Sequence, residues 1–161
     1  MKVFIISLGS VDSVVLKNLA EDLEKVLKIN VIILGSITLS EKAYSLEREQ
    51  YSGDFILKYL NRIILLENGK LLGVTEEDLY AKGLNFIFGI AQISERNAVI
   101  SLNRLKGKIR ERALKEAVHE LGHTFGLLHC KNKSCVMSFS NNLDEVDAKS
   151  SDFCSEHNFL R

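Results

Sequence analysis

The side chains best suited to catalysis lie in eleven consecutive residues, His119 to His129, which read HELGHTFGLLH. In a helix of 3.6 residues per turn, His119 and His123 lie one turn apart on the same face, so both imidazoles reach one ion. Gly126 ends this helix, because glycine adopts the left-handed conformation without a Cβ clash. The reversed chain then returns His129 to the same ion. Three histidine nitrogens with an open fourth position are typical of a catalytic zinc site.

Glu120 lies about 100° further round the same helix than His119, beside the first ligand but not in line with it. There its carboxylate can accept a proton from water beside the metal and return that proton to a departing amine. Isolated HExxH strings also occur on ordinary surface helices, but Gly126 and His129 at these offsets argue against that interpretation. The string therefore predicts a zinc hydrolase with Glu120 as general base, and peptide hydrolysis is the reaction it favours.

A second pattern of metal-binding side chains follows, and it reads Cys130-x4-Cys135-x18-Cys154-x2-His157. The chain's four histidines and three cysteines all fall between residues 119 and 157. Two short-spaced pairs separated by a loop are typical of structural zinc, and one histidine with three cysteines completes a tetrahedral site. The pattern predicts a second Zn²⁺ per chain. The alternative is three reduced cysteines in the core and a surface histidine.

The segment from His119 to His157 resembles the archaemetzincin family of metzincin zinc metallopeptidases. The family pattern places a cysteine after the third histidine, then a second cysteine followed two residues later by methionine, which here are Cys130, Cys135 and Met137. The distal CxxC of the family reads Cys154-Ser-Glu-His157 here, and its spacing from Met137 is one residue shorter. The resemblance implies that Met137 is the Met-turn residue, packed beneath the three histidines. Upstream, residues 48–51, 72–80 and 83–89 also resemble family segments.

Length and composition favour a single domain spanning residues 1–161, since 161 residues with 46% hydrophobic content can build one sizeable core. With 21 basic and 21 acidic residues, the net charge is zero, and no global field attracts nucleic acid or an anionic membrane. The longest apolar runs are far shorter than the roughly 20 residues that span a bilayer. The N-terminus lacks the pattern of a secretory signal, and cysteines assigned to metal suit a reducing compartment. We expect a cytoplasmic protein.

Periodicity in the first half predicts a parallel βαβ unit and a second helix. The unit consists of a strand at Lys2–Leu8, a helix starting at Ser10 with its core stripe at every fourth residue from Val11 to Leu27, and a strand at Asn30–Leu34. Residues 38–52 are polar and without a clean period, so we expect a loop or irregular structure at the surface. Arg48 and Gln50 could be functional there, but residue type alone favours a solvated polar face for each. The second helix is capped by Ser52 or Asp54 and carries a stripe of Ile56, Leu60, Ile63 and Ile64.

Strands are expected at Asp78–Tyr80 and Leu84–Ala91, and Asn97–Leu102 completes a hairpin with the second of these. If one strand of this hairpin forms the sheet edge beside the zinc, its free backbone groups can pair with an extended peptide. Residues 108–125 form the long zinc-binding helix, and a last helix carries Cys154 and His157 at i and i+3. The predicted fold is a single-domain α/β structure, a mixed twisted sheet with packed helices and a zinc cleft at one edge.

Two other functions fit the same residues: a zinc-dependent peptide-binding module with little catalysis, and a hydrolase of non-peptidic amides. The presence of Glu120 argues against the binding module, because binding alone needs no base beside the metal. The sequence contains neither GxGxxG nor GxxxxGK[ST], so no nucleotide cofactor is expected. The expected partner is a peptide or protein substrate. The choice between aminopeptidase and endopeptidase, and the oligomeric state, stay open.

Overall fold

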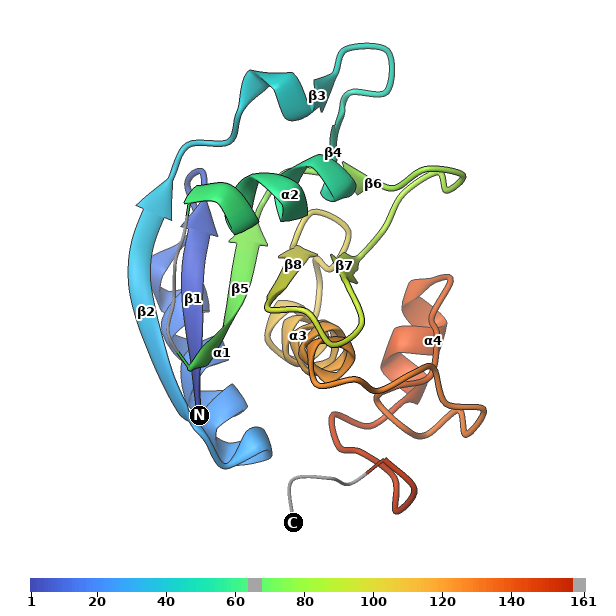
Figure 1. Ribbon diagram of the computed structural model, residues 1–161. Coiled ribbons are helices and arrows are strands. Elements are labelled where there is room, and N and C mark those ends of the chain that lie inside the picture. The colour runs from blue at the N-terminus through green and yellow to red at the C-terminus, as the bar shows by residue number, and fades with distance from the viewer. Residues whose placement is uncertain (64–67, 158–161) are drawn as a thin grey trace.

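The structure is a computed structural model that describes residues 1–63 and 68–157 (Figure 1). A mixed five-stranded sheet has the order β2-β1-β5-β8-β7, in which β7 alone runs antiparallel to its neighbour. Its strands are β1 (Lys2–Leu8), β2 (Asn30–Ile37), β5 (Gly69–Thr75), β7 (Gly89–Ala91) and β8 (Asn97–Ser101). A small second sheet contains β3 (Tyr44–Ser45), β4 (Gln50–Ser52) and β6 (Leu79–Tyr80). The predicted α/β class with a mixed sheet is confirmed.

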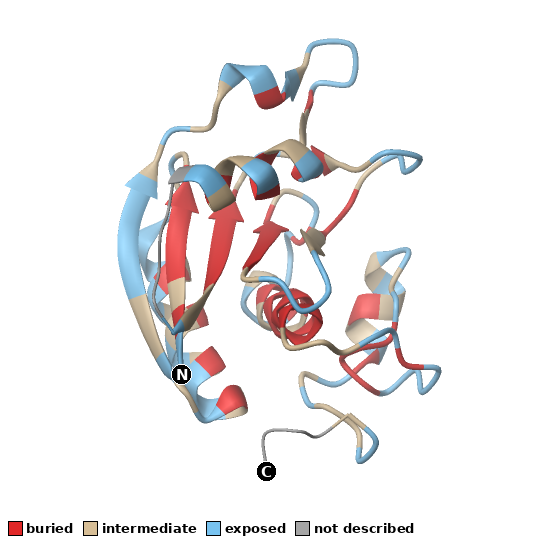
Figure 2. Ribbon diagram, viewed as in Figure 1, coloured by how far each residue is buried: buried red, intermediate tan, exposed pale blue. Residues whose placement is uncertain are grey.

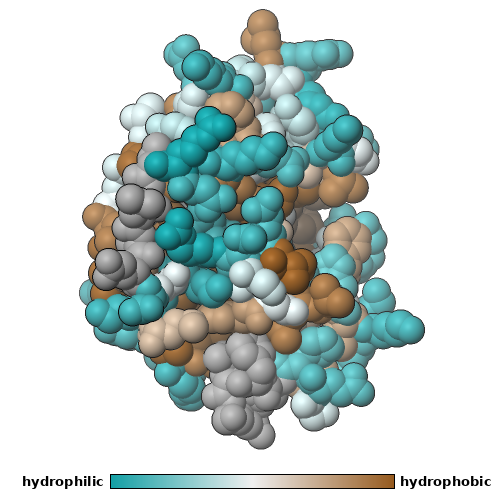
Figure 3. All heavy atoms as spheres, in the orientation of Figure 1, coloured by the Kyte–Doolittle hydropathy of each residue, from teal (hydrophilic) through white to brown (hydrophobic). Residues whose placement is uncertain are grey.

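Helices cover both faces of the large sheet. They are α1 (Ser13–Leu27), α2 (Gly53–Ile63), α3 (Ile109–Thr124) and α4 (Leu143–Ala148), with a short 3₁₀ turn, η1 (Glu41–Ala43). Side chains alternate along a strand, so in β1 Val3 and Ile5 pack toward α1 and α3, whereas Phe4 and Ile6 pack toward α2. Figure 2 shows that β1, β5, β8 and α3 are largely buried while β2 is exposed along one side. Hydrophilic residues cover most of the face seen in Figure 3.

The predicted βαβ unit is present, but its helix is capped two residues later than expected. Asp12, not Ser10, caps α1, and its carboxylate accepts a hydrogen bond from the Val14 amide at 2.8 Å. The buried stripe runs through Leu16, Leu19, Leu23 and Leu27. Residues spaced by four drift about 40° per step around a helix, so a stripe begun at Val11 leaves the core face.

The central strand β5 was not predicted. Both of its neighbours, β1 and β8, are parallel to it, and every residue from Leu71 to Thr75 is buried. A strand covered on both faces lacks the alternation by which strands are recognised. The opposite error occurred at β7, where apolar residues alternate over a longer segment than the one that pairs in the sheet. β7 is therefore shorter than the strand predicted over Leu84–Ala91. Residues 84–88, which precede β7, lie outside the large sheet and form an isolated bridge between Ile87 and Leu79.

Three further predictions need correction or fall partly outside the described residues. The segment 38–52, expected to be a loop, contains η1, β3 and β4. Ser52 caps α2 by accepting from the Phe55 amide at 3.2 Å, as predicted, while Ile64 and the Ile63 side chain are not described. The predicted last helix at Cys154–His157 is wrong: the helix is α4, capped by Asn142, and residues 154–157 form a turn. The zinc-binding helix was placed within one residue at each end.

No helix within residues 1–63 and 68–157 is long and apolar enough to cross a membrane.

Asp78 joins the two sheets through ionic and polar contacts. Arg104 donates two hydrogen bonds to its carboxylate at 2.9 and 2.8 Å, and Gln50 donates another at 2.9 Å. Burial raises the pKa of Asp78, but the hydrogen bonds from Arg104 and Gln50 outweigh it and hold this pKa below its ordinary value. A lowered folded pKa adds stability above the unfolded pKa of about 3.9 and loses it as pH falls through the folded pKa.

We therefore expect Asp78→Asn to lower the free energy of unfolding by about 1–2 kcal/mol at pH 7, because charge-assisted hydrogen bonds become neutral ones. The difference should shrink below about pH 4, where the unfolded carboxyl takes up a proton, and it should be lost as the pH falls through the lowered pKa of the folded carboxyl. Urea unfolding at pH 7, 5 and 3 measures this, with the exposed Asp152→Asn as control. A constant difference over that range would contradict the assignment.

Candidate active site

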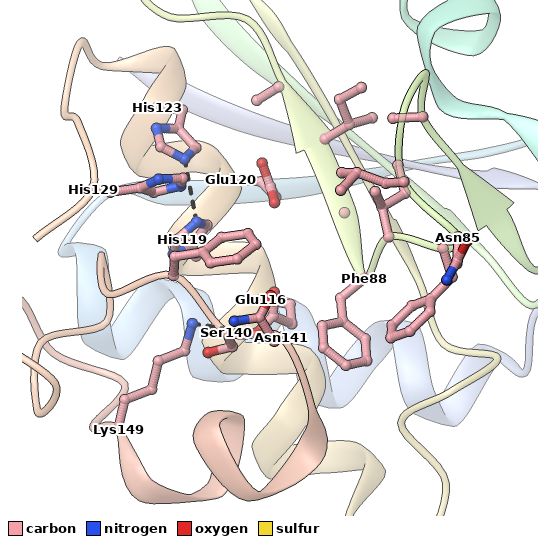
Figure 4. Close-up of a pocket in the computed structure, with 18 residues that line it drawn as sticks. Asn85, Phe88, Glu116, His119, Glu120, His123, His129, Ser140, Asn141 and Lys149 are labelled. Carbon is pink, nitrogen blue, oxygen red and sulfur yellow. Dashed lines mark hydrogen bonds and ion pairs between the residues drawn. The ribbon is translucent and has the colours of Figure 1, made fainter.

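The α3 helix presents the first two histidines on a buried face. His119 and His123 are only 5% and 7% exposed, and their Nε2 atoms lie 3.2 Å apart. Gly126 has φ +96°, the left-handed conformation expected at the helix end, and its amide donates to the His123 carbonyl at 2.9 Å. This turn brings His129 back, so that one ring nitrogen from each of the three histidines lies within 4.8 Å of the others. The three rings surround one point, as the sequence predicts (Figure 4).

Backbone carbonyls set the protonation of these rings. His119 Nδ1 lies 2.8 Å from the Val136 carbonyl oxygen, and His123 Nδ1 lies 2.7 Å from that of Leu127. A carbonyl oxygen only accepts, so each Nδ1 donates a hydrogen and each Nε2 presents a lone pair. Burial lowers the pKa of His119 well below its ordinary value and also lowers that of His123, which disfavours protonated rings.

Two facing lone pairs repel unless a cation lies between them, and a metal ion therefore fits the arrangement. Tetrahedral zinc with Zn–N bonds of about 2.0–2.1 Å holds two ligand nitrogens roughly 3.3 Å apart. The 3.2 Å between His119 Nε2 and His123 Nε2 matches that spacing. The chemistry and the geometry of these residues both suit zinc.

Glu120 shares a cavity of about 390 Å³ with the three histidines. Its side chain is buried, and a Cβ on Gly89 of β7 would lie 2.7 Å from its Cγ, so the carboxylate lies between α3 and the sheet edge. Burial raises the pKa of Glu120 well above its ordinary value, Glu116 raises it further, and Lys149 opposes the shift. A divalent cation at the histidines stabilises the carboxylate and opposes the same shift.

Met137 packs against α3 at Gly122, the residue before His123. It is fully buried, and a Cβ on Gly122 would overlap its sulfur atom. The Cys130 amide donates to the Met137 carbonyl at 2.9 Å, which fixes the methionine relative to the residue that follows His129. Gly122 thus has a role that the sequence analysis missed. A glycine inside a helix costs stability relative to alanine. Its presence at position 122 could therefore have predicted that another residue packs closely against the helix there.

The second predicted cluster also comes together. The side chains of Cys130, Cys135, Cys154 and His157 each offer a ligand atom within 4.8 Å of the others. Cys130 Sγ lies 3.8 Å from Cys154 Sγ, and His157 Nδ1 lies 3.3 Å from Cys154 Sγ. A hydrogen bond from His157 lowers the pKa of Cys154 to about 7, against the opposing effect of burial. The amides of Met137 and Cys154 both donate to Cys135 Sγ at 3.4 Å. Such donors suit thiolates that bind a metal.

Two charged residues that the sequence analysis did not single out also line the cavity. Glu116 lies one helical turn before Glu120, and Lys149 follows α4. Lys149 Nζ lies 3.3 Å from Glu116 Oε1, and it donates to the Ser138 carbonyl at 3.2 Å. The spacing of Glu116 and Glu120 was a readable signal, since residues four apart share a helix face. Nothing in the local sequence marks Lys149.

Arg48 and Gln50 support the outer wall of the cavity instead of entering it. Gln50 is buried and donates to the Asn85 carbonyl at 2.9 Å. Arg48 donates to the Leu84 carbonyl at 3.2 Å, and its guanidinium lies 4.3 Å from the centre of the Tyr80 ring. The interpretation of Gln50 as part of a solvated face is therefore wrong: the side chain is buried, and its amide bonds to Asp78 and to the Asn85 carbonyl inside the protein.

Comparison with known proteins agrees with this geometry. Residues 11–159 match the model of peptidase family M54. Archaemetzincin of Archaeoglobus fulgidus is 44% identical over 160 residues, which cover 97% of this chain and 96% of that protein. The crystal structure of archaemetzincin from Methanopyrus kandleri matches with a TM-score of 0.90 at 41% identity, over 99% of this chain and 93% of that one. A zinc-dependent peptidase from Methanocorpusculum labreanum matches with a TM-score of 0.83 at 26% identity, over 98% of each chain.

Fold and site together define a zinc metallopeptidase. More narrowly, the chain belongs to peptidase family M54, the archaemetzincins. The family resemblance predicted from the sequence is confirmed.

The contact between Gly122 and Met137 is directly testable. Gly122→Ala forces a methyl group into the methionine sulfur, so we expect a loss of about 1–3 kcal/mol in the free energy of unfolding together with weaker metal binding. The double variant Gly122→Ala/Met137→Ala relieves the overlap, and its destabilisation should be smaller than the sum of the two single changes. Urea unfolding and metal titration measure both effects, and strictly additive losses would show that the two residues do not interact.

Proposed function

We propose that residues 1–161 form one peptidase domain in which His119, His123 and His129 hold a catalytic zinc ion and Glu120 is the general base. One observation carries this proposal. The Nε2 atoms of His119 and His123 lie 3.2 Å apart with their lone pairs facing each other, because the Nδ1 atom of each ring bonds to a carbonyl oxygen. When bound there, zinc would lower the pKa of a water molecule and would polarise the scissile carbonyl.

Glu120 performs the proton transfers in this proposal. Its carboxylate accepts a proton as water attacks the carbonyl carbon, and it delivers that proton to the departing amine nitrogen. Burial supports this role, because it strengthens the proton affinity of the carboxylate and keeps bulk water away from the proton. Its position beside β7 supports it as well, since the base then faces a substrate on that strand.

The substrate is a peptide held in extended form along β7. Among the described strands, β7 pairs only with β8, so its other edge keeps free N–H and C=O groups. β7 also lines the cavity that contains Glu120 and the histidines. An added peptide strand pairs through its backbone, which places successive side chains on alternate sides of the cleft.

Cys130, Cys135, Cys154 and His157 are proposed to bind a second, structural zinc ion. Their number and types complete a tetrahedral site without an open position. All three cysteines are free of disulfides, and a reducing compartment such as the cytoplasm keeps such thiols available for metal.

Glu120→Gln tests the base. Glutamine keeps the size of the side chain but takes up no proton, so turnover of peptides should fall by about 10²- to 10⁴-fold while zinc content stays unchanged. The assay uses peptides with free and with blocked N-termini, which also separates aminopeptidase from endopeptidase activity. The exposed Glu111→Gln on the same helix is the matched control. Full activity in Glu120→Gln would remove Glu120 from the mechanism.

Zinc content tests the two ligand sets. Wild-type protein should hold about two ions, and His123→Ala or Cys154→Ser should each hold about one. Only Cys154→Ser should also lower the melting temperature strongly, because binding free energy at a closed site is largely folding free energy. His157→Cys should keep both ions. If His157→Ala kept two tightly bound ions and an unchanged melting temperature, His157 would not be a ligand.

A further inference from the structure

A buried ion pair closes one end of the catalytic cavity. The Lys149 side chain is fully buried, and Glu116 is 4% exposed. Figure 4 shows Glu116, Lys149, Ser140 and Asn141 grouped together, apart from His123 and across from Phe88. The proposed mechanism assigns no task to these groups. Replacing a buried ion pair by well-packed apolar residues is often neutral or stabilising, so this pair is weak evidence for a purely stabilising role.

Two acceptor atoms at this end lack hydrogen bonds. Glu116 Oε1 and Ser140 Oγ are both buried, and neither has a hydrogen-bond partner among the described residues. Lys149 lies 3.3 Å from Glu116 Oε1, close enough for an ion pair, but the geometry is not that of a hydrogen bond. A buried oxygen without a donor is costly, and most such atoms in proteins find a partner. A substrate donor can supply the missing bond.

Aromatic rings line the same cavity as these two oxygens. Phe86 and Phe88 form one wall and meet edge to face, with ring centres 5.2 Å apart. The Arg104 guanidinium lies 4.0 Å from the centre of the Phe86 ring and holds that wall in position. Phe139 also lines the cavity, and its ring centre lies 5.3 Å from that of His129. A side chain entering beside the histidines therefore meets both aromatic rings and these polar atoms.

We propose that this end of the cavity binds the side chain of a residue flanking the scissile bond and selects tyrosine, through its ring against the phenylalanines and its hydroxyl donating to Glu116 or Ser140. This inference rests on the proposed function. Lysine and arginine are disfavoured because Lys149 repels a second cation there. Acidic side chains are disfavoured by Glu116 and Glu120, and phenylalanine fills the walls but leaves both oxygens without a donor.

Two peptide series with blocked termini test this selection. One varies only the residue before the cleaved bond and the other only the residue after it, with Tyr, Phe, Lys or Glu at that position. In one of the two series we expect kcat/KM for Tyr to exceed that for Phe by about 10- to 100-fold, the range for a hydrogen bond to a charged group. The Lys and Glu peptides should be at least as poor as Phe. Equal rates for Tyr and Phe in both series, or a preference for Lys, would overturn the proposal.

Variants assign the selection to the named atoms. Ser140→Ala should lower the Tyr-to-Phe ratio about three- to tenfold, and Glu116→Leu/Lys149→Met should bring it near one. The double change removes both charges together, which avoids leaving a buried charge unpaired. The matched control is Asp22→Asn/Arg110→Met, which removes an ion pair between α1 and the far side of α3 and should leave the ratio unchanged. If the Glu116/Lys149 variant fails to fold, an unchanged ratio in Ser140→Ala alone would overturn the proposal.

Binding separates this inference from the proposed function. The zinc-loaded Glu120→Gln protein can bind the same Tyr and Phe peptides, and calorimetry gives their Kd values without turnover. A Tyr preference in binding, with no hydrolysis of any peptide by the wild-type protein, would sink the proposed function and keep the pocket assignment. Hydrolysis of the peptides with equal binding of Tyr and Phe would keep the function and sink the pocket assignment.

Discussion

The active site depends on two hydrogen bonds from imidazole Nδ1 atoms to backbone carbonyls. They orient the His119 and His123 rings so that both Nε2 lone pairs face one point. Neither carbonyl belongs to the regular hydrogen bonding of α3: that of Leu127 lies beyond the Gly126 turn, and that of Val136 lies in the loop leading to Met137. The geometry of the proposed metal site is therefore set by the two segments packed against the helix as much as by the helix itself.

Those segments are held by the cysteine cluster and by Met137. Val136 lies between Cys135, a member of the cluster, and Met137, whose sulfur occupies the space left by Gly122. Cys130 follows His129 directly, and its amide pairs with the Met137 carbonyl. Because the chain between these points is short, a shift of the cluster moves both a histidine ligand and the carbonyl that orients another. The proposed structural zinc is thus coupled to the catalytic site through covalent neighbours.

The α3 helix serves the core and the site with different residues of the same turns. Ala117, Val118 and Leu121 belong to the hydrophobic core, while Glu116, His119 and Glu120 line the cavity. All six are buried, so the polar side chains have lost water and need partners inside the protein. The Nδ1 atom of His119 bonds to a carbonyl oxygen and Glu116 forms an ion pair with Lys149, whereas the proposed mechanism assigns the carboxylate of Glu120 to the reacting groups. The buried apolar residues of α3 thereby stabilise the fold, and its buried polar residues line the cavity of the proposed active site.

The sequence by itself determined the candidate metal-binding residues, the long helix, the cysteine cluster and the family, because each depends on side-chain types at short fixed spacings. The positions of His119, Glu120 and His123 follow from helix geometry alone. Only the tertiary structure decided that β5 is the centre of the sheet, that β7 is an edge, and that Lys149 reaches Glu116. The reason is that a doubly covered strand has no alternation and an edge is defined by the absence of a neighbour. Lys149 and Glu116 are 33 positions apart in the sequence, so their contact leaves no local pattern and forms only when the chain has folded.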